Sequence, residues 1–148
     1  MIALVASTLL SGCGGHEYGG VELSEHVPER YLAEVERSLD LAGENGPEIL
    51  DALISVTDDD RDALSFLVAE LPHVDLAMVD AEFLLDTVAR ARETSELFPW
   101  GEHIPRDVYL HYVLPPRVSQ EPLEDWRGYL LERLRPRIED LTSMEEAA

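Results

Sequence analysis

Apolar residues recur at intervals of three and four along the chain from Pro28 onward, and glycines and prolines separate these runs. This spacing places apolar side chains on one face of a helix, so it predicts amphipathic helices that pack against one another. No segment alternates apolar and polar residues between hairpin turns, and no strand is predicted. We therefore expect an all-α fold, a compact array of about six short helices. The expected ranges are 28–42, 45–56, 57–71, 80–95, 105–114 and 122–140.

Individual residues set the expected helix ends. Gly43 should end the first helix, Thr57 and Asp80 should cap the third and fourth, and Pro136 should kink or break the last. Three acids, Asp58, Asp59 and Asp60, should lie in solvent in the first turn of the third helix, where they complement the helix dipole. The side chains expected to face inward on the second and last helices are Ile49, Leu50, Leu53, Ile54, Leu123, Trp126, Leu130, Leu134 and Ile138.

The chain is strongly acidic. Its 148 residues contain 31 Asp and Glu against 11 basic residues, all of them Arg, which gives a formal net charge of −20. Such a surface repels phosphates, so nucleic-acid binding is excluded. The charge is uneven, because residues 1–116 carry 6 Arg and 23 acids whereas residues 117–148 carry 5 Arg and 8 acids. The nearly neutral carboxy-terminal part, with Arg127, Arg133, Arg135 and Arg137, is the part best able to pack on another domain.

The amino terminus resembles that of a bacterial lipoprotein. Residues 1–12 are uncharged and apolar, and they are too few for the roughly 20 residues that span a bilayer, which is typical of a signal-peptide core. The four residues Leu10, Ser11, Gly12 and Cys13 match the lipobox, where cleavage precedes a lipidated cysteine. The basic segment that normally comes first is missing, so a start upstream of Met1 stays open.

This resemblance implies a domain organisation and a location. Residues 1–12 would be the signal peptide, and residues 13–27 would be the lipidated cysteine and a glycine-rich, flexible tether before the helical domain of residues 28–148. The chain would then be held to a membrane of the bacterial cell envelope by its lipid. Gly14 stands where many such proteins have an Asp that retains them at the inner membrane, which favours an outer membrane facing the periplasm.

No catalytic, metal or cofactor site is predicted from the side chains. The only cysteine is Cys13, and the five histidines lack any metal-ligand spacing. The acids Asp58, Asp60 and Asp62 alternate as in a calcium loop, but Ala63 and Ala69 stand where that loop needs glycine and a bidentate glutamate. A pair of carboxylates acting as acid and base stays open, since 31 acids make no particular pair informative.

Aromatic residues and prolines are concentrated after residue 97. A Pro99-Trp100 pair, an Ile104-Pro105 helix start and a Val113-Leu114-Pro115 segment are followed by Asp125-Trp126-Arg127. In this order the motifs resemble the region before the catalytic core in bacterial transglutaminase-like (papain-like) proteins of the cell envelope, over about residues 32–148. The residues that carry the resemblance, all expected to be structural, are Pro99, Trp100, Pro105, Tyr112, Pro115, Trp126 and Arg127. A simpler reading makes Trp100, Tyr109, Tyr112 and Trp126 core aromatics.

The resemblance implies a function. A transglutaminase-like core performs acyl transfer or peptide hydrolysis with a Cys nucleophile, a His and an acid. No Cys follows Cys13, so we expect residues 28–148 to be a noncatalytic helical domain that continues into, and braces, a downstream catalytic domain of the same protein. The alternative is a stand-alone acidic lipoprotein that acts as a binding or scaffold module for a cationic partner.

Overall fold

The computed structural model describes residues 16–98, 100–117 and 121–138, and it confirms the predicted all-α fold. Each of the six expected helices is present. A further one-turn helix, α4 (His73–Leu76), was not predicted, because four residues are too few to show a period. The six are α1 (Leu32–Ala42), α2 (Gly46–Ser55), α3 (Asp58–Glu70), α5 (Ala81–Leu97), α6 (Arg106–Val108) with the adjoining π-helical turn η5 (Tyr109–Val113), and α7 (Trp126–Ile138). Short 3-10 turns connect them: η1 (Leu23–Glu25), η2 (Glu29–Tyr31), η3 (Gly43–Asn45) and η4 (Gly101–His103).

Three of the predicted helix ends are confirmed in position, at Gly43, Thr57 and Asp80, and the last helix differs. Gly43 ends α1 with a φ of 58°, and the carboxylate of Asp80 caps α5 by accepting from the backbone N–H of Phe83 at 2.7 Å. Thr57 stands at the N-cap of α3, but its hydroxyl donates to the carboxylate of Asp60 and does not accept from a backbone N–H. Helix α7 begins at Trp126 rather than at residue 122, and Pro136 lies inside its last turn without ending it.

The apolar core lies between α1, α2, α3 and α5. Each of these helices contributes side chains that are completely or almost completely buried, and these include Val35, Leu39, Ile49, Leu53, Leu64, Val68, Leu84 and Val88. The prediction for Ile54 is wrong, because 42% of this residue is exposed. On α2 the buried positions are Ile49, Ala52 and Leu53, and Ile54 lies about 100° further around the helix than Leu53.

Residues 16–27 are folded, although the sequence led us to expect a flexible tether there. Strand β1 (Glu17–Tyr18) pairs antiparallel with β2 (Val21–Glu22), and Gly19 and Gly20 form the turn with φ values of 59° and 84°. Leu23 and Val27 are then buried in the core, with 0% and 3% exposed. A two-residue Gly-Gly loop is a hairpin signal, which could have revealed this segment.

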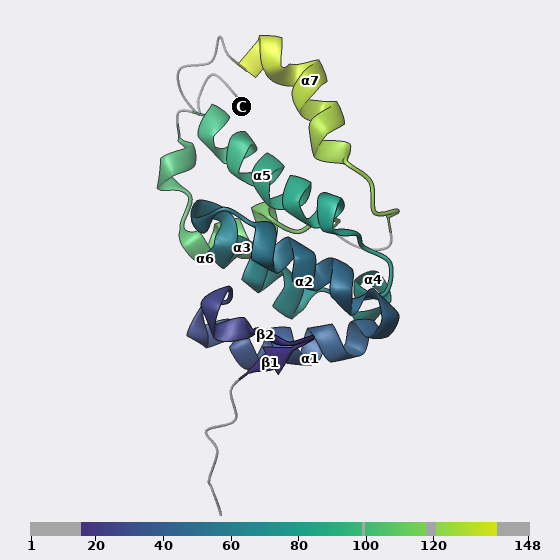
Figure 1. Cartoon of the computed structure of the whole chain (residues 1–148). Helices are drawn as coiled ribbons and strands as arrows, with labels where there is room; N and C mark the ends of the chain where they lie inside the picture. Colours follow the sequence, from purple (N-terminus) through teal and green to yellow (C-terminus); the bar gives the residue numbers. More distant parts are fainter. Residues whose placement is uncertain (1–15, 99, 118–120, 139–148) are drawn as a thin grey trace, which may run out of the picture.

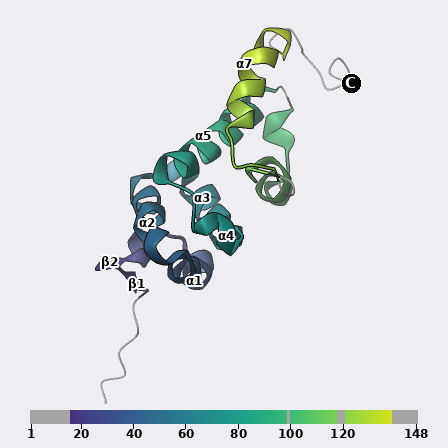
Figure 2. The same ribbon diagram turned by 90° about the vertical axis from the view of Figure 1, so that its right-hand side faces the viewer.

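The elements are stacked from one end of the molecule to the other. Strands β1 and β2 lie with α1 at one end, and α7 lies at the opposite end in both views (Figures 1 and 2). Helix α5 crosses between them and contacts both α2 and α7. The first described residues and the last described helix are therefore far apart.

Candidate functional site

An apolar groove runs along one side of α7, with a cavity volume of about 290 Å³. The carboxy-terminal end of α5 and the π-helical turn η5 form its other wall. Its lining residues are Thr94, Phe98, Tyr112, Val113, Trp126, Arg127, Leu130, Leu131 and Leu134. Tyr112 is 82% exposed and Trp126 is 42% exposed, so large apolar surfaces here are in contact with water. Clustered exposed apolar side chains of this kind mark interaction surfaces more often than single ones do.

Helix α7 faces the body with a different side from the one that we predicted. Trp126, Leu130 and Leu134 were expected to point inward, but each is at least 36% exposed. The buried positions are Arg127 and Leu131, each 7% exposed. Arginine is almost never fully buried unless it is paired, so the sequence pattern favoured the apolar side.

Arg127 is buried because it satisfies backbone carbonyls at and just after the end of the turn η5. Its Nη2 donates to the carbonyl oxygens of Val113 and Pro115. These carbonyls lie where a helix ends and its last acceptors lack partners. Burial lowers the pKa of Arg127 from its ordinary value, and the nearby Tyr109 and Asp125 partly oppose that effect. The guanidinium therefore holds α7 against the chain at residues 113–115.

Trp126 makes the second half of this attachment. Its indole Nε1 donates to the carbonyl of Pro116 at 2.5 Å, and the guanidinium of Arg127 lies 4.5 Å from the centre of the Trp126 ring. A cation over the face of an indole is attracted to it. We call this pair, Trp126 and Arg127 with the carbonyls of residues 113, 115 and 116, the clasp.

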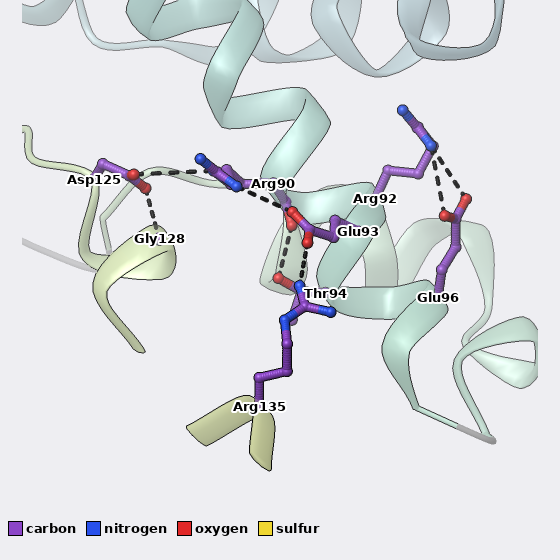
Figure 3. Close-up of polar contacts among 8 residues, drawn as sticks. All are labelled: Arg90, Arg92, Glu93, Thr94, Glu96, Asp125, Gly128 and Arg135. Atoms are coloured by element: carbon purple, nitrogen blue, oxygen red, sulfur yellow. Dashed lines mark hydrogen bonds and ion pairs between the residues drawn. The ribbon is translucent and has the colours of Figure 1, made fainter. Parts of the chain in front are cut away.

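Polar contacts between α5 and α7 reinforce the clasp (Figure 3). Asp125 accepts from the backbone N–H of Gly128 at 2.8 Å, and its other oxygen lies 4.0 Å from Nε of Arg90. Glu93 on α5 forms ion pairs with Arg90 and with Arg135 of α7. A Cβ at residue 128 would lie 2.0 Å from a carboxylate oxygen of Asp125, so a side chain there would displace this carboxylate from its cap. Helix α7 is thus held by polar groups along its length.

The structure brings together four of the predicted family-motif residues. Pro115, Trp126 and Arg127 belong to the clasp, and Tyr112 lines the adjoining groove. The other motif residues have separate positions. Trp100 stacks on Phe98 with ring centres 4.9 Å apart, and Pro105 accepts from the backbone N–H of Tyr109 where α6 begins. The lipobox residues Leu10, Ser11, Gly12 and Cys13, together with Pro99, lie outside the described residues.

The reading of four core aromatics holds for Tyr109, which is 9% exposed, and fails for Tyr112. The reason is the π-helical turn, in which the backbone N–H of Leu114 bonds to the carbonyl of Tyr109 five residues earlier. The widened turn rotates Tyr112 away from the core. Burial raises the pKa of the Tyr109 phenol, and Arg106 partly opposes that increase.

Asp60 is buried, although we expected it in solvent with Asp58 and Asp59. It is 5% exposed and accepts from Nε of Arg92 at 2.9 Å. Hydrogen bonding to Asp60 raises the pKa of Arg92 from its ordinary value. The pair ties α3 to α5. Within the described ranges, no three His, Cys, Asp or Glu side chains cluster closely enough to hold a metal ion.

Comparison with known proteins gives no family for the chain. In the part that the structure describes, no helix combines the length and the apolar character that crossing a bilayer requires. Because no related protein is found, the resemblance to transglutaminase-like envelope proteins stays a prediction. The groove and the clasp are the features that bear on function. No protein-family model, curated protein or solved structure matches this chain.

Proposed function

We propose that this chain is a noncatalytic helical domain of a lipid-anchored bacterial envelope protein, and that it braces a transglutaminase-like core of the same protein. The observation that carries the proposal is the apolar groove beside α7. Tyr112, Trp126, Leu130 and Leu134 are exposed there, next to a clasp that fixes their positions. Packing against a further domain would remove this apolar surface from water, at about 25 cal/mol per Å².

The polar groups of the groove favour docking over catalysis. The hydroxyl of Thr94 donates to the carbonyl of Arg90 at 2.7 Å, and Arg127 donates to the two carbonyls of the clasp. General acid–base catalysis needs titratable side chains that converge on the reacting atoms. Thr94 and Arg127 are thus already engaged in holding the fold, so this surface is suited to binding.

The geometry also supports an orientation for the anchored domain. Cys13 precedes the first described residue, His16, by three positions, and three residues reach at most about 10 Å. A lipid on Cys13 would hold the end that contains β1 and α1 close to the membrane. Because α7 lies at the opposite end (Figures 1 and 2), the groove would face away from that membrane.

Sequencing the gene beyond both ends of this reading frame tests the bracing function. We expect a downstream region that encodes a Cys, a His and an Asp in that order, as a papain-like core requires. A stop codon directly after the codon for Ala148 would overturn the bracing function.

Metabolic labelling with a radioactive fatty acid tests the anchor separately. The wild-type chain should incorporate the label and Cys13→Ser should not. Ser11→Thr serves as a control for general effects of substitution near the cleavage site. Equal labelling of the wild-type chain and Cys13→Ser would overturn the lipid anchor.

The surplus of acids favours a second candidate, a stand-alone lipoprotein that binds a cationic partner. Exposed acids lie on α1, the turn η3 and α2, outside the groove, and they include Asp40, Glu44 and Asp51. Binding of an Arg-rich peptide should then weaken on replacing these three acids by amides, and also on raising the salt from about 0.05 M to 0.5 M. Binding that is unaffected by both changes would exclude this candidate.

A further inference from the structure

We infer that the groove accepts an amphipathic α-helix with an acidic flank. This inference rests on the proposed function and specifies what the docking partner presents. Trp126, Leu130 and Leu134 are spaced four residues apart, so they form a row about 12 Å long on α7. Phe98 and Tyr112 line the facing wall. A groove between two such apolar ridges fits an amphipathic helix, because apolar residues three or four positions apart form one face of a helix.

The charge of α7 selects the flank of that helix. Helix α7 contains four Arg and one Glu, a net charge of +3, whereas α1, α2, α3 and α5 each carry a net negative charge. Arg133 and Arg137 are exposed. They lie seven and eleven positions after Trp126, which places both within roughly 20° of it around the helix. The outer edge of the groove is therefore a basic rim formed by Arg133 and Arg137.

The basic rim acts locally in spite of the net charge of −20. At physiological salt the Debye length is about 8 Å, so charges further away are largely screened. Exposed acids also lie around Trp126 at the beginning of α7, namely Glu82, Asp86, Glu124 and Asp125. Arg133 and Arg137 follow about 10 and 16 Å further along the helix, beyond a Debye length from that end. Carboxylates on a bound helix would therefore interact mainly with Arg133 and Arg137 where they lie along the second half of α7.

The same observations disfavour two other occupants. A second copy docked through this groove about a twofold axis would bring its own Arg133 and Arg137 toward the same residues, and like charges in an interface are costly. A membrane that holds a lipid on Cys13 would lie at the end of β1 and α1, so it would not reach the groove. A helix from another domain or protein carries no copy of these arginines and can reach the groove at the end away from the membrane.

Fluorescence titration of Trp126 tests the inference. The chain has two tryptophans, so Trp100→Phe leaves Trp126 as the only reporter. Two helical peptides of about 14 residues would share one leucine face and differ only in flanking Glu or Lys. We expect the Glu peptide to shift the Trp126 emission to shorter wavelength and to bind about tenfold more tightly than the Lys peptide.

Two sets of variants separate a specific groove from general adhesion. Arg133→Glu with Arg137→Glu should reverse the preference between the two peptides. Leu130→Asp should abolish binding, whereas Leu41→Asp should leave it unchanged, because Leu41 is equally apolar and 51% exposed but lies on α1. Circular dichroism on each variant establishes that the helices are retained.

Several results would overturn the inference. These are equal binding of both peptides, binding of neither, dimerisation of the peptide-free chain in sedimentation, and an emission shift caused by phosphatidylglycerol vesicles. A red shift of the Trp126 emission on shortening the chain after Ile138 would assign the groove to residues 139–148 instead.

Failure of this inference can be told apart from failure of the bracing function. A stop codon after Ala148 overturns the bracing function alone. A downstream catalytic core, found together with no binding of either peptide, overturns this inference alone.

Discussion

The body of the molecule and its last helix are held together by different forces. In the body, α1, α2, α3 and α5 bury aliphatic side chains such as Leu39, Leu53 and Leu84 completely. In α7 the buried residues are Leu131 and Arg127, while Trp126 and Leu130 are exposed. The body is thus stabilised mainly by removing apolar surface from water. Helix α7 is attached mainly by hydrogen bonds and ion pairs, which leaves its apolar side available to a partner.

The largest effect should come from the core of the body. Leu53→Ala removes a side chain that is completely buried, and it leaves a cavity between α2 and its neighbours. We expect the free energy of unfolding to fall by about 3 kcal/mol. Urea denaturation followed by circular dichroism measures this loss. A change below about 1 kcal/mol would contradict the view that burial stabilises the body.

Removing the clasp should loosen α7 without unfolding the body. Arg127→Met keeps most of the packing but leaves the carbonyls of Val113 and Pro115 without their donor. The local cost should be about 2 kcal/mol. Hydrogen exchange should then accelerate for the amides of α7 and stay unchanged for those of α2. Arg133→Met, at an exposed position of the same helix, is the matched control. Equal acceleration of exchange in α7 and α2 of Arg127→Met would contradict the view that α7 is attached independently of the body.

The phenol of Tyr109 should make the contact between these regions sensitive to alkali. Folding raises the pKa of this group by burial, so the folded chain holds the phenolic proton more tightly than the unfolded chain does. Its contribution is fully present below the ordinary pKa of about 10 and is lost as the pH rises through the folded value. Tyr109→Phe should reduce the loss of stability between about pH 9 and 11. If the free energies of unfolding of the wild-type chain and of Tyr109→Phe fell in parallel over this pH range, the role of the Tyr109 phenol would be refuted.

The smallest effect should be found on the groove. Leu130→Ala shortens a side chain that is 39% exposed, so stability should change by no more than about 0.5 kcal/mol. Leu131→Ala, at the neighbouring and buried position, should cost about 2 kcal/mol. Measuring both variants by urea denaturation compares the two sides of α7 directly. Equal losses would mean that Leu130 also contributes to the fold.

The fold could be predicted from the sequence where its determinants are local. Spacing of apolar residues, with signals such as Gly43 and Asp80, located the six helices, because a helix depends on residues three or four positions apart. The hairpin at Gly19 and Gly20 has a local signal as well, but we interpreted these glycines as part of a flexible tether after Cys13 and predicted no hairpin.

The candidate site depends on contacts that sequence spacing does not contain. Arg127 is buried only because the carbonyls of Val113 and Pro115, on another element, accept its hydrogen bonds. Tyr112 is exposed only because η5 widens into a π-helical turn. The motif that includes Trp126 and Arg127 forms the clasp, while the groove beside it was not predicted.

The clasp gives the groove a property beyond its shape. Trp126 is fixed by its bond to Pro116 and by the guanidinium above its ring, so its rotamer is set before any partner arrives. The conformational entropy of this aromatic side chain has already been lost during folding. Association therefore starts from a preorganised surface, and less ordering opposes binding than at a surface of mobile side chains.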